Sequence, residues 1–178
     1  MKNFFKLAII FFSFIYSISL NDGRPTHHFC KKAAKSDPNL SYNFCVRSLE
    51  ANPKTQNATL EELVNISIKL TISNATNISS SISQLLNQKN LDAYTRGALQ
   101  DCLELYSDAN SELNEAMCDL KKKDYFKANI DVSSAMDSST TCEDGFKEKK
   151  GMVSPLTKEN NAFFQWTAIV LAFINMLS

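Results

Sequence analysis

An unbroken apolar stripe in the middle of the chain constrains the fold most strongly. Between residues 60 and 86, Leu, Val, Ile and Ala recur at steps of three and four, which is the repeat of one face of an α-helix. Thr59 followed by Glu62 has the pattern of a capping box and predicts where this helix begins. The segment is rich in Ser, Thr and Asn, so its intrinsic helix propensity is modest and other helices must bury its apolar face.

Three more long helices are expected after this one, joined by short connections. They are predicted over residues 92–123, 124–151 and 154–177, with Ser154 as N-cap of the last one. Upstream, residues 26–50 predict two short helices around a turn at 36–39. Four Gly and four Pro in 178 residues are too few for the turns of a many-stranded β fold. The predicted fold class is therefore all-α, an up-down-up-down four-helix bundle preceded by a short α-hairpin.

Both ends of the chain are apolar, and each has its own interpretation. Residues 1–19 combine two lysines, an apolar run and small residues at 17 and 19, which is typical of a secretory signal peptide. Cleavage there would leave residues 20–178 as one domain, while a retained signal anchor is the alternative. The stretch from Phe163 onward is interpreted as a buried bundle helix, against a membrane span or a lipid-anchor signal. We therefore expect a secreted protein without stable membrane insertion.

Charge and motifs exclude several functions. Nineteen basic residues balance nineteen acidic ones, which argues against nucleic acid as a partner. The chain has no G-x-S-x-G, H-E-x-x-H or Gly-rich phosphate loop, so we expect no enzyme, metal or cofactor. Acidic pairs such as Glu61 with Glu62 and Glu143 with Asp144 are expected on solvated helix faces.

Secretion makes the five cysteines candidates for disulfides. Cys30 and Cys45 lie one on each arm of the predicted hairpin, and a bridge between them would close it. Spacing alone does not select the other pairs, but helical register places Cys102 and Cys142 on apolar stripes and Cys118 on a polar face. We therefore expect a bridge between Cys102 and Cys142 and a free thiol at Cys118. A monomer is expected, with a dimer linked through Cys118 as the alternative.

Secretion also makes N-x-S/T sequons candidates for glycosylation. The chain has five of them, at Asn39, Asn57, Asn65, Asn74 and Asn77. Asn74 and Asn77 are too close together for efficient use of both.

Taken together, these features resemble the plant invertase and pectin methylesterase inhibitor family. The resemblance is carried by the signal peptide, the cysteine hairpin, the second cysteine pair in a four-helix bundle, and residues 142–151. It implies bridges from Cys30 to Cys45 and from Cys102 to Cys142. It also implies a non-enzymatic inhibitor that acts in the cell wall space (apoplast) or the vacuole.

Within that family, invertase inhibitors carry a Pro-Lys-Phe motif just before the third bundle helix. The matching stretch here has an aromatic residue and a lysine but no proline, and it consists of Asp124, Tyr125, Phe126 and Lys127. The resemblance implies target binding at these residues, with the ring supplying contact area and the ammonium pairing with a carboxylate of the target. Of Phe126 and Lys127, only Phe126 is expected to have a packing role.

The expected function is inhibition of an acid invertase (β-fructofuranosidase) by blocking its active-site cleft. Inhibition of pectin methylesterase, through faces of the middle bundle helices, is the alternative within the family. A secreted helical ligand carrier, or a pollen-type protein without inhibitory activity, is the alternative of another class.

Overall fold

The computed structural model describes residues 24–178, so the predicted signal peptide lies outside the described residues. The elements follow in the order α2 (Pro25–Ser36), α3 (Tyr42–Glu50), the 3₁₀ helix η1 (Pro53–Thr55), α4 (Leu60–Leu86), α5 (Ala93–Lys121), α6 (Tyr125–Lys147) and α7 (Thr157–Ile174). The described residues contain no strand. The prediction of an all-α fold, with a short hairpin ahead of four longer helices, is confirmed.

The starts of the middle helices follow from local capping. At α4, the Thr59 hydroxyl accepts from the Glu62 amide while the Glu62 carboxylate accepts from the Thr59 amide, which is the predicted capping box. At α5, the Asp92 carboxylate accepts from the amides of Tyr94 and Thr95. These side chains satisfy amides that have no partner inside the helix.

The last helix begins later than predicted. Ser154 does accept from the Leu156 amide, at 3.1 Å, but this bond closes a turn ahead of the helix. Leu156 has a non-helical φ of −109°, and regular helix starts only at Thr157. The Ser-Pro pattern therefore marks the turn that leads into α7 rather than its first residues, and α7 ends at Ile174 rather than near Leu177.

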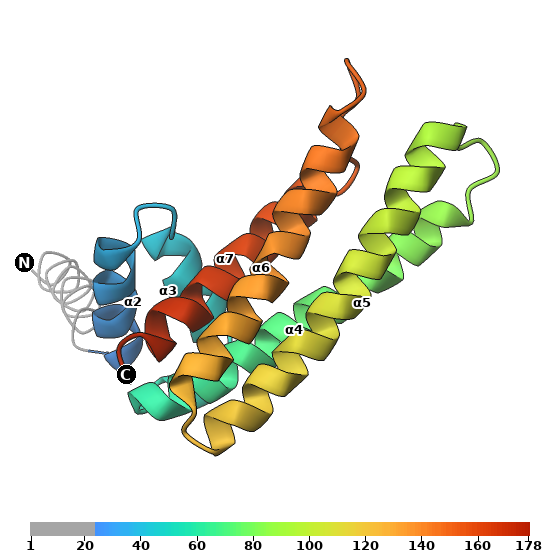
Figure 1. Cartoon of the computed structure of the whole chain (residues 1–178). Helices are drawn as coiled ribbons and strands as arrows, with labels where there is room; N and C mark the ends of the chain where they lie inside the picture. Colours follow the sequence, from blue (N-terminus) through green and yellow to red (C-terminus); the bar gives the residue numbers. More distant parts are fainter. Residues whose placement is uncertain (1–23) are drawn as a thin grey trace, which may run out of the picture.

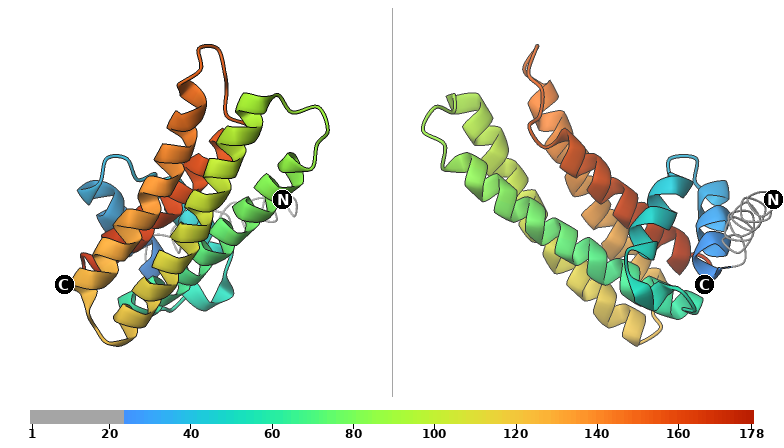
Figure 2. Two further views of the ribbon diagram at one scale, coloured as in Figure 1. Left: turned by 45° about the vertical axis from the view of Figure 1, so that its right-hand side comes forward. Right: turned by 180° about the vertical axis from the view of Figure 1, so that it is seen from behind.

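The four long helices form a bundle that encloses one core (Figures 1 and 2). Helix α5 packs against α4 and α6, and α7 packs against α6 and α4, so the four helices close on themselves. The largest fully buried side chains include Tyr106, Phe146, Phe163 and Phe173. The α4–α5 and α6–α7 pairs diverge toward the end that carries the loops within each pair (Figure 2). None of the described helices is both long and apolar enough to cross a membrane.

A polar network crosses this core and corrects one expectation. The Tyr106 hydroxyl donates to Asn160 Oδ1 at 2.8 Å, and Asn160 Nδ2 donates to Glu143 Oε2 at 2.8 Å. The Thr157 hydroxyl also donates to Glu143, at 2.8 Å. Glu143 was expected on a solvated face, but it is half-buried and joins α6 to α7. Burial, with two nearby carboxylates, raises the pKa of Tyr106 and keeps its hydroxyl protonated as a donor.

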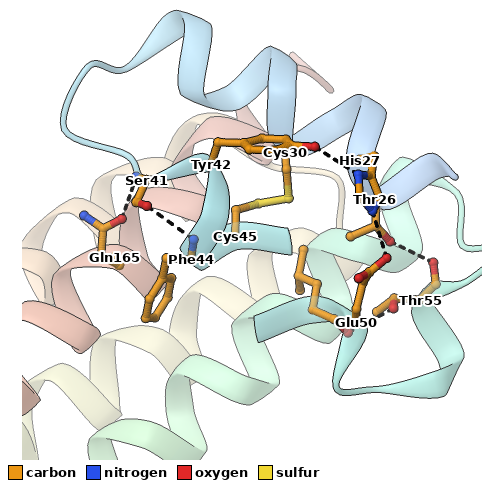
Figure 3. Close-up of a disulfide and its surroundings, with 11 residues drawn as sticks. Thr26, His27, Cys30, Ser41, Tyr42, Phe44, Cys45, Glu50, Thr55 and Gln165 are labelled. Atoms are coloured by element: carbon orange, nitrogen blue, oxygen red, sulfur yellow. Dashed lines mark hydrogen bonds and ion pairs between the residues drawn. A yellow bond between two sulfur atoms is a disulfide. The ribbon is translucent and has the colours of Figure 1, made fainter. Parts of the chain in front are cut away.

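The N-terminal hairpin is held by a disulfide and by hydrogen bonds within the chain (Figure 3). Cys30 on α2 is bonded to Cys45 on α3. His27 contacts the Tyr42 hydroxyl through Nδ1 at 2.9 Å and the Glu50 carboxylate through Nε2 at 3.0 Å.

Hydrogen bonds also attach the hairpin to the rest of the chain on two sides. The buried hydroxyl of Thr26 donates to the carbonyl of Thr55 in η1, at 3.1 Å. On the other side, Gln165 of α7 accepts from the Ser41 amide and donates to the Asn39 carbonyl, both at 2.7 Å. A bond from the Thr26 side chain to the 3₁₀ helix and two bonds with the Gln165 side chain of α7 therefore help to fix the position of a unit too small to bury a core of its own.

Candidate functional site

The turn between α5 and α6 is unusually tight, because three residues, 122–124, join two long helices. The Lys123 amide donates to the Leu120 carbonyl at 3.0 Å and the Asp124 amide donates to the Asp119 carbonyl at 2.9 Å. These two bonds form a Schellman motif, whose central residue adopts the left-handed conformation and is usually glycine. Here that residue is Lys123, with φ of 60°, the one non-glycine residue with positive φ in the described chain. The turn thus stores backbone strain.

The predicted target-binding stretch begins α6 directly after this turn. Asp124 is the N-cap, and its carboxylate accepts from the Lys127 amide at 3.1 Å. Tyr125 is half-buried and packs against the core. Phe126 points the other way and is 79% exposed. One turn later Ile130 is 51% exposed on the same face of α6, since residues four apart lie above one another.

Lys127 lies beside Phe126 but is bound within the chain. Its ammonium lies 2.6 Å from Asp119 Oδ2 and 3.7 Å from Asp131 Oδ2. The expectation that only Phe126 could have a packing role is therefore wrong. Phe126 is too exposed to pack, whereas Lys127 neutralises a carboxylate whose side chain is 4% exposed.

Asp119 is the residue that sequence analysis missed at this site. Its Oδ1 accepts from Lys122 at 3.0 Å and its Oδ2 from Lys127 at 2.6 Å. The hydrogen bonds from Lys127 and Lys122 lower the pKa of Asp119, and the bond to Asp119 raises the pKa of Lys127. Asp131 differs, because burial raises its pKa and its Oδ2 accepts no hydrogen bond.

Cys118 lies next to this cluster as an exposed free thiol. A hollow of about 250 Å³ separates it from the lysines, lined by Asn114, Glu115, Cys118, Asp119, Lys122 and Lys127. The other bridged pair, Cys102 with Cys142, joins α5 to α6 nearer the other end of these helices. That pair lies beside a groove of about 630 Å³, which is also lined by Tyr94, Gly97 and Asp144.

The sequons are distributed over the hairpin turn, the loop before α4, and α4 itself. Four of the five asparagines are exposed, namely Asn39, Asn57, Asn65 and Asn77. Asn74 is half-buried, and its Oδ1 is buried without a hydrogen-bond partner. Exposure therefore favours the other four as glycan carriers.

Comparison with known proteins identifies the family. The model of the family described as plant invertase/pectin methylesterase inhibitor matches residues 26–173. The chain belongs to this family. It is 45% identical over 178 residues to the "Putative invertase inhibitor" of Platanus acerifolia, with 99% of each protein covered. It is also 39% identical over 149 residues to pectinesterase inhibitor 12 of Arabidopsis thaliana, covering 83% of this chain and 84% of that protein.

A solved structure shows the same fold. It is the crystal structure of a mutant form of a pectin methylesterase inhibitor from Arabidopsis, which aligns with a TM-score of 0.69 at 26% identity. The alignment covers 77% of this chain and 90% of that one. Members of the family are proteinaceous inhibitors of enzymes, and the chain is not itself an enzyme.

Proposed function

We propose that this inhibitor acts on an acid invertase, with the α5–α6 turn entering the active-site cleft of the enzyme. The observation that carries the proposal is Phe126, a large ring that is 79% exposed at the start of α6. An exposed aromatic side chain beside a lysine is a typical anchor for a protein interface. The name of the Platanus relative, which is similar over nearly its whole length, supports the same target.

Inhibition of pectin methylesterase is the second candidate, and it is favoured by the names of the Arabidopsis relative and of the aligned structure. The polar face of α4 could supply its contact surface. However, the hydroxyls on that face already donate to carbonyls four residues earlier in the same helix, at Thr76, Ser79, Ser80, Ser81 and Ser83. This leaves few free donors there and makes the turn the stronger contact surface.

We further propose that the protein works outside the cell as a monomer, in the cell wall space, with the vacuole as the alternative. The predicted signal peptide and the two disulfides support an oxidising compartment. The exposed sequon at Asn39, on the hairpin turn, supports glycosylation, whereas Asn65 on α4 lines the same hollow as Tyr125 of the proposed contact.

The test compares both target enzymes and two exposed apolar residues. Purified protein is titrated against an acid invertase and a pectin methylesterase, and the inhibition constant is measured for the parent and for Phe126→Ala. We expect inhibition of the invertase, and a loss of about tenfold or more for the variant, as for an interface anchor. Phe126→Ala with Lys127→Ala should lose at least as much.

Val153→Ala is the matched control, because Val153 is 80% exposed but lies in the loop between α6 and α7. It should inhibit like the parent. Equal losses for Phe126→Ala and Val153→Ala would remove the turn from the contact. A parent that inhibits only pectin methylesterase would replace the first target by the second, and inhibition of neither enzyme would refute both.

A further inference from the structure

Asp119 is the one buried charged residue among residues 24–178, at 3% exposure. It lies near the end of α5, and each of its carboxylate oxygens is bound by a different lysine. Lys122, three residues later at the C-cap of α5, lies 3.0 Å from Oδ1. Lys127, on the next helix, lies 2.6 Å from Oδ2. One carboxylate thus has two independent cationic partners.

This arrangement limits what Lys127 can do for a target enzyme. Its ammonium can pair with a target carboxylate only if it leaves Asp119. A carboxylate that loses a hydrogen-bonded cation is destabilised, and Asp119, which lines the hollow beside Cys118, would then have only water as a partner on that side. With Lys127 as the only partner of Asp119, its release would offset much of the gain from the new contact.

Lys122 removes most of that cost. Its side chain is 71% exposed, and its bond to Asp119 lies within the end of α5, so it does not depend on where Lys127 is. The backbone of Asp119 is also fixed, because its carbonyl accepts from the Lys122 amide at 3.0 Å and the Asp124 amide at 2.9 Å. The carboxylate can therefore stay in place and remain paired while the side chain of Lys127 alone moves.

We propose that Asp119 is a positioning residue that holds Lys127 beside Phe126 in the free inhibitor and releases it to a carboxylate of the target enzyme, while Lys122 keeps Asp119 paired. The exchange breaks the two ion pairs of Lys127, with Asp119 and with Asp131, and forms one with the target, and no proton changes place. The transfer of Lys127 to a carboxylate of the target rests on the proposed function. The holding of Lys127 in the free protein does not depend on the target.

The first experiment tests the holding step without any enzyme. NMR titration of the Lys127 side-chain signal in the free protein should show Lys127 losing its proton at higher pH in the parent than in Asp119→Asn, because the bond to Asp119 raises the pKa of Lys127. A Lys127 signal that titrates at the same pH in the parent and in Asp119→Asn would overturn the holding step, whatever the protein inhibits.

The second experiment tests the role of Lys122 in release. Lys122→Gln is compared with Lys121→Gln, which changes the same charge one residue earlier but does not involve a partner of Asp119. We expect Lys122→Gln to weaken inhibition about tenfold, because release of Lys127 then leaves Asp119 unpaired. Lys121→Gln should stay within about twofold, the range of a rim charge. Circular dichroism checks that each variant folds.

The double variant completes the cycle. In an Asp119→Asn background there is no buried charge to leave unpaired, so Lys122→Gln should have no further effect. Equal effects of Lys121→Gln and Lys122→Gln, or the same loss from Lys122→Gln in both backgrounds, would overturn the proposal. A parent that inhibits neither enzyme refutes the proposed function instead, and the NMR result then still decides the holding step.

Discussion

The N-terminal hairpin and the α5–α6 turn both reverse the chain between two helices, but they do so in opposite ways. In the hairpin a disulfide links the arms, and Glu50 is shared by Arg24, at 2.9 Å, and His27, at 3.0 Å. In the turn a Schellman motif reverses the chain at the cost of a left-handed Lys123. It leaves Phe126 exposed.

The carboxylates next to the two regions differ as well. In the seam between α5 and α6, Glu112 and Asp131 each have one buried oxygen that accepts no hydrogen bond. Both regions bond charged groups within the chain, but only the region of the turn also keeps a left-handed residue, an exposed ring and nearby buried oxygens that accept no hydrogen bond. Departures of this kind from local consistency are typical of functional sites. This contrast supports the proposal that the hairpin contributes stability and the turn contacts the target.

Removing the hairpin disulfide is expected to give the largest loss of stability, which tests the role of the hairpin. Changing Cys30 and Cys45 together to Ala should lower the free energy of unfolding by about 3 kcal/mol for a loop of this length. Urea denaturation measures the loss, and inhibition at a temperature where the variant is folded should be unchanged. Cys118→Ser is the control and should unfold like the parent, because that thiol is free. A folded variant that no longer inhibits would place the hairpin in the contact.

A smaller loss is expected from Thr55→Val, which removes a buried hydroxyl under the hairpin. This hydroxyl donates to the Leu49 carbonyl at 2.9 Å and the Asn52 carbonyl at 2.8 Å. Leaving these acceptors unpaired should cost about 1–2 kcal/mol of unfolding free energy. The matched control is Thr76→Val, whose hydroxyl is exposed on α4, and it should change stability little. Equal losses from both variants would contradict the role of buried bonds in the hairpin.

The sequence predicts features that depend on neighbours along the chain. The capping box at Thr59 and the N-cap at Asp124 are local hydrogen bonds, so their patterns can be recognised in one dimension. The apolar stripe from 60 to 86 predicts α4 for the same reason. The candidate site at residues 124–127 came from family resemblance, and Phe126 is exposed there.

What could not be predicted depends on how one helix is rotated against the next. Asp119 directly precedes the core residue Leu120, but nothing local indicates that its second partner, Lys127, lies on α6. Glu143 looks like ordinary surface charge until α7 brings Asn160 and Thr157 to it. Both residues are polar groups whose burial is created by packing, which a periodic pattern does not encode.

A modest gain in stability is expected from relaxing the strained turn. Lys123→Gly removes the cost of a side chain in the left-handed region, about 1–2 kcal/mol, against about 0.4–1 kcal/mol for the greater freedom of glycine in the unfolded chain. The pair between Lys123 and Glu61, at 3.7 Å on the surface, adds little. The net gain should be roughly 0.5–1 kcal/mol in urea denaturation. Lys122→Gly is the control and should lose stability, because Lys122 has helical φ and pairs with Asp119. A loss for Lys123→Gly would show that the turn is unstrained.

The smallest effect is expected from Glu112→Gln. This variant should change the stability in the opposite direction to Glu50→Gln in the hairpin. Burial raises the pKa of Glu112 above its ordinary 4.5, so its charged form is the destabilising one. Glu112→Gln should therefore be more stable than the parent at neutral pH, within about 0.5 kcal/mol because the group is only partly buried. This advantage should vanish as the pH falls through the raised pKa, where the parent takes up its proton. Glu50→Gln should instead lose stability at neutral pH, since it breaks the ion pair with Arg24. Urea denaturation at several pH values measures both, and equal signs at neutral pH would contradict the contrast between the two regions.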